Sequence, residues 1–285
     1  MNAVTDFSLP IMRPVSPQRA NGTVDLVFGC DAVTSRTRIR RFYQAGCLRA
    51  RLPRTGGVGP CEAVLLNISG GIAGGDQLRS DITLEAGARV VVSGQAAERL
   101  YRALGDDPAI ISTAITLDAG ARLEYLPQET IFFDGFRLRR TLEINMAADA
   151  RYLGVEALVF GRQAMGEQVR RGMLRDRILL RREGGVLLRD MNRLDGDVHE
   201  ILARPALGDG AMAMASLIYA APDAQARLAD LRAALAMAEQ AGASVVEGVL
   251  VARILASSAA ALRQTVLAAL AVCRDGRAMP RVWQS

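Results

Sequence analysis

Ile-Thr-Leu-Glu-Ala-Gly-Ala-Arg-Val, at residues 82–90, recurs as Ile-Thr-Leu-Asp-Ala-Gly-Ala-Arg-Leu at residues 115–123. A degraded third copy, Ile-Asn-Met-Ala-Ala-Asp-Ala-Arg-Tyr, occupies residues 144–152. Each copy alternates apolar and polar side chains, passes through a turn and enters a second apolar segment, which predicts a strand–turn–strand unit. Repeated units of this length stack and bury a common core, and the alternation argues against helical repeats of similar period.

The turns of these repeats and two neighbouring segments extend the β prediction. Gly87 and Gly120 supply the left-handed turn conformation, and Asp149 in the third copy can approximate it. A fourth hairpin is expected at residues 177–189, where Glu-Gly-Gly separates two apolar segments. Residues 95–104 are expected to form a short helical or irregular insertion between the layers.

The last third of the chain has a different pattern. Asp223 is expected to cap a helix of about 17 residues, and a Val-rich strand is expected over residues 244–255. Ser257 or Ser258 then caps a second helix. These elements predict an α+β fold that is predominantly β, with a layered β-strand scaffold, strand–turn–strand repeats and a small helix–strand–helix C-terminal part.

The chain of 285 residues is long enough to bury a large core. We expect a flexible N-terminus at residues 1–22, followed by a single β-rich domain over residues 23–285, because nothing resembling a linker divides the rest. Within that domain, residues 25–205 are expected to form the layered β-sheet and residues 206–285 an α/β subregion.

Composition argues against several classes of function. All 35 basic residues are arginine, so chemistry that needs a lysine amine, such as P-loop nucleotide hydrolysis or Schiff-base formation, is not expected. The net charge of +5 is spread without a basic block, and aromatic residues make up only 5%, so no nucleic-acid partner is expected. The longest apolar run, residues 211–221, is too short to cross a bilayer. We expect a cytoplasmic protein with no membrane partner.

A glycine-rich segment at residues 65–76, Leu-Leu-Asn-Ile-Ser-Gly-Gly-Ile-Ala-Gly-Gly-Asp, follows an apolar strand. Such a run indicates crowded or unusual backbone. It is not a Walker loop, because Asp76 stands where that loop needs a lysine. The loop glycines are Gly70, Gly71, Gly74 and Gly75.

The sequence shows no pattern typical of a metal site or of a nucleophilic catalytic site. His199 is the only histidine, and the cysteines Cys30, Cys47, Cys61 and Cys273 are scattered, so neither a zinc site nor a Ser-His-Asp triad is indicated. We therefore predict no catalytic residues.

Several carboxylates occur in or beside apolar segments, where a charge is costly unless it is paired or hydrated. One interpretation is an internal arginine–carboxylate network, with Arg162 as the natural partner of Glu156. The alternative is a β-layered, carboxylate-dependent hydrolase or lyase that uses Asp76 and Glu129. The acidic residues concerned are Asp76, Glu98, Glu129, Asp134, Glu156 and Glu167.

Five segments in the same order and spacing resemble one family, the urease accessory protein D family, called H in some organisms. They are Asn67-Ile-Ser-Gly-Gly-Ile-Ala-Gly-Gly-Asp76, Gln95-Ala-Ala-Glu-Arg-Leu-Tyr101, Leu126-Pro-Gln-Glu-Thr-Ile-Phe-Phe-Asp-Gly135, Gly161-Arg-Gln-Ala-Met-Gly-Glu167 and Pro280-Arg-Val-Trp283. The resemblance extends from about residue 35 to the end of the chain. It implies a β-rich cytoplasmic scaffold without catalytic activity.

The resemblance also implies a nickel-insertion chaperone. Its partners would be apo-urease, the helical accessory protein F and the GTPase G, and nickel would pass transiently through an internal passage without a permanent cofactor. By resemblance, Asp76 and Glu156 are candidate lining residues, and Glu98 is a third. Residues with a structural or partner-facing role would be Glu129, Asp134, Arg162 and Glu167.

Overall fold

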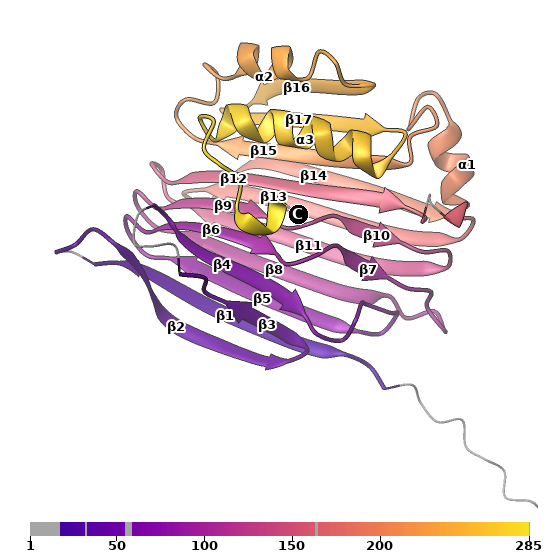
Figure 1. Ribbon diagram of the computed structural model, residues 1–285, viewed down its shortest axis with the longest axis horizontal. Coiled ribbons are helices and arrows are strands. Elements are labelled where there is room, and N and C mark those ends of the chain that lie inside the picture. The colour runs from indigo at the N-terminus through magenta and orange to yellow at the C-terminus, as the bar shows by residue number, and fades with distance from the viewer. Residues whose placement is uncertain (1–17, 32, 55–58, 163–164, 285) are drawn as a thin grey trace, which may run out of the picture.

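The computed structural model describes residues 18–31, 33–54, 59–162 and 165–284. Two β-sheets pack face to face, and helices near the C-terminus cover part of the outer face of one of them (Figure 1). The expected β-dominant α+β fold class is confirmed.

The first sheet has the strand order β14-β13-β11-β8-β5-β1-β2. Its central pairs β1–β5, β5–β8, β8–β11 and β11–β13 are parallel, and the outer pairs β1–β2 and β13–β14 are antiparallel. The strands are β1 (Asn21–Cys30), β2 (Thr37–Gly46), β5 (Gln77–Leu84), β8 (Ala109–Leu117), β11 (Phe136–Met146), β13 (Gly172–Arg182) and β14 (Gly185–Gly196).

The second sheet has the order β16-β17-β15-β12-β9-β6-β4-β3, with β10 pairing β12 and β7. Its strands are β3 (Leu48–Arg51), β4 (Cys61–Asn67), β6 (Arg89–Gly94), β7 (Glu98–Leu100), β9 (Arg122–Leu126), β10 (Thr130–Phe132), β12 (Arg151–Phe160), β15 (Ala213–Ala220), β16 (Gln240–Val246) and β17 (Val249–Ala256). The expected insertion at residues 95–104 is not helical, since it contains β7.

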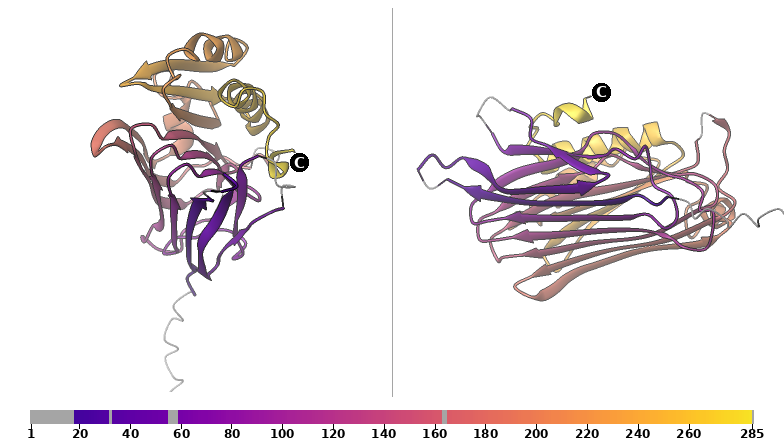
Figure 2. Two further views of the ribbon diagram at one scale, coloured as in Figure 1. Left: turned by 90° about the vertical axis from the view of Figure 1, so that its left-hand side faces the viewer. Right: turned by 90° about the horizontal axis from the view of Figure 1, so that it is seen from below.

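The sequence repeats are arches between the two sheets. Each first strand, β5, β8 or β11, lies in the first sheet, and each second strand, β6, β9 or β12, lies in the second. Successive arches stack in parallel and enclose the core between the sheets (Figure 2). The hairpin interpretation of these units was therefore wrong, because the two strands within one unit face each other across the core and form their hydrogen bonds with other strands, not with each other.

The turns of the arches show how the repeats differ. Gly87 and Gly120 have the expected positive φ, at 70° and 67°. Asp149 does not; its carboxylate accepts a hydrogen bond of 2.9 Å from the Gly120 amide of the preceding arch. The aspartate thus secures the stack through its side chain.

The fourth unit is a true hairpin. Strands β13 and β14 pair antiparallel, and Glu183 and Gly184 between them have φ of 49° and 77°. Two successive left-handed residues suit the twist of a tight hairpin. The prediction at residues 177–189 is confirmed.

The C-terminal part differs from the expected helix–strand–helix order. Helix α2 (Leu228–Ala234) is shorter than predicted and begins after Arg227, because Asp223 accepts bonds from Tyr219 and Arg227 instead of capping. The predicted single strand is the hairpin β16–β17, with Gly248 at its turn (φ 74°). Helix α3 (Ala259–Cys273) is capped by Ser258, as one of the two expected serines. Two further helical segments are α1 (Val198–Ala203) and the short η2 (Arg281–Trp283).

Two apolar clusters hold the chain together. One fills the space between the sheets, and the other lies between the second sheet and helices α2 and α3. Strand β12 contributes to both, since Tyr152, Leu158 and Phe160 enter the first cluster while Leu153 and Val155 enter the second. Because side chains alternate along a strand, Glu156 must face the space between the sheets.

Candidate functional site

A cavity of about 350 Å³ lies between the two sheets. Its lining comes from both sheets and from the glycine-rich segment, and it includes Gly71, Glu98, Arg140 and Glu156. The structure therefore brings two of the three candidate metal-lining carboxylates, Glu98 and Glu156, to one cavity.

Arg140 connects the sheets at the cavity wall. From β11 of the first sheet, its Nη1 lies 2.7 Å from Oε2 of Glu156 on β12 of the second. The same guanidinium donates two bonds of 2.9 Å to Asp176 on β13, its register partner. Arg140 and Asp176 are buried, and Asp176 also accepts a bond of 3.4 Å from Asn192. One cation thus serves two carboxylates.

The two carboxylates respond differently to this arrangement. Burial raises the pKa of Glu156 to about 7; Arg140 only partly opposes that rise, and Asp176 adds to it. Burial also opposes ionisation of Asp176, but Arg140 and the bond from Asn192 hold its pKa below its ordinary value of 3.8. Asp176 is therefore the fixed counter-ion of Arg140, and Glu156 can gain or lose a proton near neutrality.

Glu98, on β7, has no cation within ion-pair distance among the residues that the structure describes. Its carboxylate accepts a bond of 3.2 Å from the Asn67 side chain. Burial raises the pKa of Glu98 to about 7, opposed by the Asn67 bond, the Arg99 amide and the Arg99 charge. Like Glu156, Glu98 titrates near neutral pH.

Asp76 lies in an adjacent pocket of about 670 Å³, which shares Gly71 with the inter-sheet cavity. Its oxygens accept bonds of 2.8 Å from the backbone amides of Ala20 and Ala73. Asp76 is only 5% exposed. Through these two hydrogen bonds it ties the segment before β1 to the glycine-rich loop. These bonds give the residue a structural role.

The glycines of this loop are required by space and by conformation. A Cβ on Gly71, whose φ is 142°, would lie 2.3 Å from a ring carbon of Tyr101. A Cβ on Gly74 would lie 2.5 Å from the Asp107 carbonyl oxygen. Gly70 and Gly75 have φ of 84° and 87°. The prediction of crowded, unusual backbone is confirmed.

The other candidate side chains form separate ion pairs. Arg162 is not the partner of Glu156; it pairs with Glu167 at 2.8 Å, which in turn accepts a bond from the Asp134 amide. Asp134 also accepts bonds from the amides of Arg170 and Arg171. Within the described chain these contacts brace the loop between β12 and β13.

The carboxylates of the enzyme alternative are not brought together. Glu129 lies 3.6 Å from Arg263 on α3, whereas Asp76 lines the pocket beside the glycine-rich loop. No group of three or more His, Cys, Asp or Glu side chains among the described residues could hold a metal ion. His199 lies in the short helix α1.

Sequence reasoning missed Arg140, Asp176 and Cys47. Along β11 and β13, inward and outward residues alternate, and Arg140 and Asp176 fall at inward positions. A charged residue on the otherwise apolar face of each strand could therefore have identified them. Cys47 lines the Asp76 pocket, and burial raises its pKa, with a further rise from the charges of Asp76 and Glu98. Nothing in its sequence context marked it.

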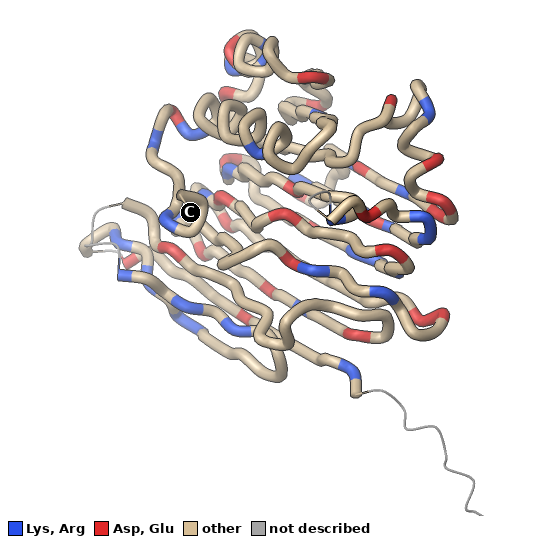
Figure 3. The backbone as a smooth tube through the Cα atoms, turned by 45° about the vertical axis from the view of Figure 1, so that its right-hand side comes forward, with Lys and Arg blue, Asp and Glu red and all other residues tan. Residues whose placement is uncertain are grey.

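Strands β5, β11, β13 and β14 carry both acidic and basic residues, whereas β2 and β3 carry arginines alone (Figure 3). Within the described ranges, no helix is long and apolar enough to cross a membrane.

Stacked β-arches around a cavity lined by two carboxylates of the second sheet, Glu98 and Glu156, define a two-sheet β-arch protein. The family model of the UreD urease accessory protein matches residues 20–284. The chain therefore belongs to the UreD family of urease accessory proteins. Its role is accessory, in urease maturation, and it is not an enzyme.

Relatives from several bacteria match over nearly their whole length. The chain is 43% identical over 267 residues to urease accessory protein UreD of Azorhizobium caulinodans, covering 93% of this chain and 97% of the relative. It is 45% identical over 275 residues to the protein of the same name from Methylobacterium sp. (strain 4-46), covering 94% and 96%. It is 41% identical over 270 residues to urease accessory protein UreD of Chelativorans sp. (strain BNC1), covering 95% of this chain and 96% of the relative.

Proposed function

We propose that this chain acts in the cytoplasm as a nickel-insertion chaperone, which binds apo-urease and the accessory proteins F and G and passes nickel towards the urease active site. The observation that carries the proposal is that Glu98 and Glu156 line the same inter-sheet cavity. Nickel would be transient cargo there and not a resident cofactor.

The chemistry of the cavity suits transfer better than storage. Divalent nickel binds imidazole and thiolate groups more tightly than isolated carboxylates. Glu98 and Glu156 stand singly and contact an amide and an arginine, respectively. A cation that meets one carboxylate at a time is held weakly and is released readily.

The ion triad of Arg140, Glu156 and Asp176 determines how strongly this wall of the cavity attracts a cation. When Glu156 is ionised, the two carboxylates outweigh Arg140 by one negative charge. When Glu156 is protonated, Asp176 and Arg140 cancel, and the local attraction disappears. Because the pKa of Glu156 is about 7, the electrostatic state of this wall changes near neutral pH.

Access to the cavity depends on the glycine-rich loop. Gly71 lies in the lining of both the inter-sheet cavity and the Asp76 pocket. Asp76 anchors this loop through the Ala20 and Ala73 amides, and nickel would pass from the Asp76 pocket to the inter-sheet cavity beside Gly71. We propose Asp76 as the outer member of this route.

The whole role is tested by deleting the gene and measuring urease activity, urease-bound nickel and recovery of urease with the F and G proteins. We expect apo-urease that accumulates without nickel and regains activity when the gene is restored. Fully nickel-loaded urease in the deletion strain would overturn the proposal. Turnover of a substrate by the isolated chain would instead favour the carboxylate-dependent hydrolase or lyase.

A further inference from the structure

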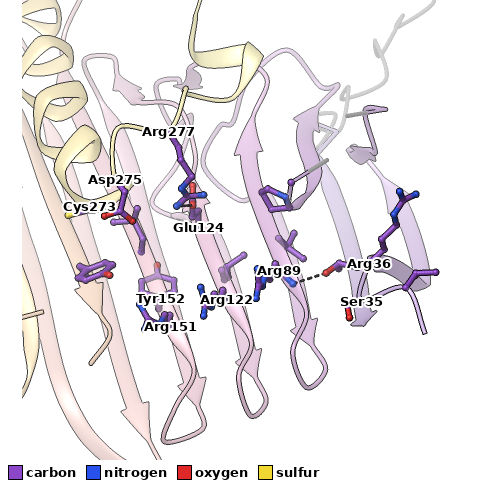
Figure 4. Close-up of a pocket in the computed structure, with 18 residues that line it drawn as sticks. Ser35, Arg36, Arg89, Arg122, Glu124, Arg151, Tyr152, Cys273, Asp275 and Arg277 are labelled. Carbon is purple, nitrogen blue, oxygen red and sulfur yellow. Dashed lines mark hydrogen bonds and ion pairs between the residues drawn. The ribbon is translucent and has the colours of Figure 1, made fainter. Parts of the chain in front are cut away.

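A third pocket, of about 680 Å³, lies where the arches enter the second sheet (Figure 4), and neither Glu98 nor Glu156 of the inter-sheet cavity lines it. Arginine side chains dominate its polar lining, and its floor includes Val90 and Leu123. A divalent cation would be repelled from this pocket, so it does not belong to the proposed nickel route. The lining arginines are Arg36, Arg89, Arg122, Arg151 and Arg277.

Three of these arginines come from the sequence repeat itself. Arg89, Arg122 and Arg151 are the arginines that end each Ala-Gly-Ala-Arg or Ala-Asp-Ala-Arg turn, and they begin strands β6, β9 and β12. Arg89 pairs in register with Arg122, and Arg122 with Arg151. Neighbouring strands lie about 4.8 Å apart, so like charges are stacked side by side, which is unfavourable without a counter-charge.

The carboxylates of the pocket do not supply that counter-charge. Glu124 is already held by Arg274 and Arg277, each at 2.6 Å. Asp275 is held by Arg227 at 2.7 Å. Both acidic side chains are therefore paired with arginines outside the stacked row of Arg89, Arg122 and Arg151.

Among the residues that the structure describes, Arg36, Arg89 and Arg122 have no ion-pair partner, whereas Arg151 contacts Asp223 at 3.3 Å. Burial and the charges of Arg89 and Arg151 lower the pKa of Arg122, which records the mutual repulsion within the row. The pocket therefore carries a surplus of positive charge that a bound anion would offset.

We propose that this pocket binds a small anion carrying two or more phosphate groups. Guanidinium groups form paired hydrogen bonds with phosphate oxygens, and a row of them can engage successive groups. The volume falls within the range of small-molecule sites. Strands β6 and β9 are hydrogen-bonded on both sides, which leaves no free edge for an extended acidic peptide to join.

The chain provides a matched control row. Arg139, Arg175 and Arg193 are register neighbours on β11, β13 and β14 of the first sheet. They are exposed on strands whose alternate residues fill the core, and none of them lines the arginine pocket. Removing two arginines from either row changes the net charge equally, so only the pocket distinguishes the two changes.

The test is isothermal titration calorimetry of the purified full chain with sodium tripolyphosphate, compared with orthophosphate. We expect saturable binding of tripolyphosphate, weaker binding of orthophosphate and loss of affinity as salt rises. Arg89→Gln with Arg122→Gln should weaken tripolyphosphate binding about tenfold to a hundredfold, since charged hydrogen bonds are lost. Arg139→Gln with Arg175→Gln should leave the affinity unchanged.

Arg36→Gln provides a second variant that leaves the stacked row intact, since its side chain lies outside the arches. It should weaken binding less than the double change, and circular dichroism would establish that each variant is folded. Absence of saturable binding, or equal loss in the pocket and control variants, would overturn the proposal. Tighter binding of a hexaglutamate peptide than of tripolyphosphate would overturn it in favour of an acidic protein segment.

Discussion

The guanidinium of Arg140 lies 2.7 Å from the carboxylate of Glu156, and this contact joins the two sheets at the wall of the internal cavity. Arg140 comes from β11 and Glu156 from β12, the two strands of one arch. The same repeat unit that builds the core therefore also places a titratable carboxylate opposite its partner.

Replacement of Arg140 tests how much the triad of Arg140, Glu156 and Asp176 contributes to the stability of the fold. Arg140→Met leaves the buried Asp176 and the largely buried Glu156 without their cation, so the free energy of unfolding should fall by about 3–5 kcal/mol. Arg177→Met, which breaks the half-exposed pair with Glu143, should cost at most about 1 kcal/mol. Urea unfolding measures both; equal costs would mean that the triad contributes no more than a surface pair.

Glu98 should make the folded chain sensitive to pH. Its pKa is about 7 when folded against an ordinary 4.5, so the folded state binds this proton more tightly than the unfolded state. The resulting stabilisation is full below pH 4.5 and is lost as pH rises to about 7. Glu98→Gln should therefore raise stability at pH 8 by on the order of 2 kcal/mol.

Urea unfolding of wild type and Glu98→Gln between pH 5 and 8 measures this effect. Glu156 contributes in the same direction, so the slope should shrink in Glu98→Gln and shrink further in the double variant with Glu156→Gln. An unchanged slope in Glu98→Gln would show that the carboxylate is solvated.

Gly70 and Gly71 should respond differently to the same change. Gly71→Ala forces a Cβ against Tyr101 in a left-handed conformation, at a cost of roughly 2–5 kcal/mol. Gly70→Ala meets no atom within 4 Å and should cost only about 1 kcal/mol for its positive φ. Thermal unfolding separates them, and similar losses would mean that Tyr101 moves aside freely.

Asp76 is expected to stabilise its loop through its two acceptor oxygens. Asp76→Asn replaces one acceptor by a donor facing a backbone amide, which should cost about 1–3 kcal/mol. Asp81→Asn, in the exposed pair with Arg79, is the control and should change stability little. Chemical denaturation provides the measurement, and equal values for the two variants would argue against the anchoring role.

The repeats made most of the β architecture predictable. Alternation and the turn glycines located the strands around residues 82–90 and 115–123, and Glu183-Gly184-Gly185 located the true hairpin. Local sequence could not decide whether a turn joins strands of one sheet or of two, because that choice depends on packing across the core. The length and start of helix α2 were mispredicted for a similar reason, since Asp223 accepts hydrogen bonds from Tyr219 and Arg227 instead of capping the helix.

The carboxylates of the site could be predicted from the sequence, but the arginines that pair with them could not. Glu156 was recognisable as a charge within an apolar strand, yet its partner is Arg140 and not the nearby Arg162. Partners across a sheet sandwich are distant in sequence, and spacing along the chain does not reveal them. The glycine-rich loop was correctly expected to be crowded because glycine content reflects local backbone needs.

The central claim is that carboxylates of the inter-sheet cavity carry nickel towards urease. The most direct measurement is the nickel content of urease purified from cells lacking the gene and complemented with the double variant Glu98→Gln, Glu156→Gln. We predict that urease still co-purifies with the variant chain but contains much less nickel, whereas Glu143→Gln on the outer face restores full loading. Full nickel loading with the double variant would contradict the account.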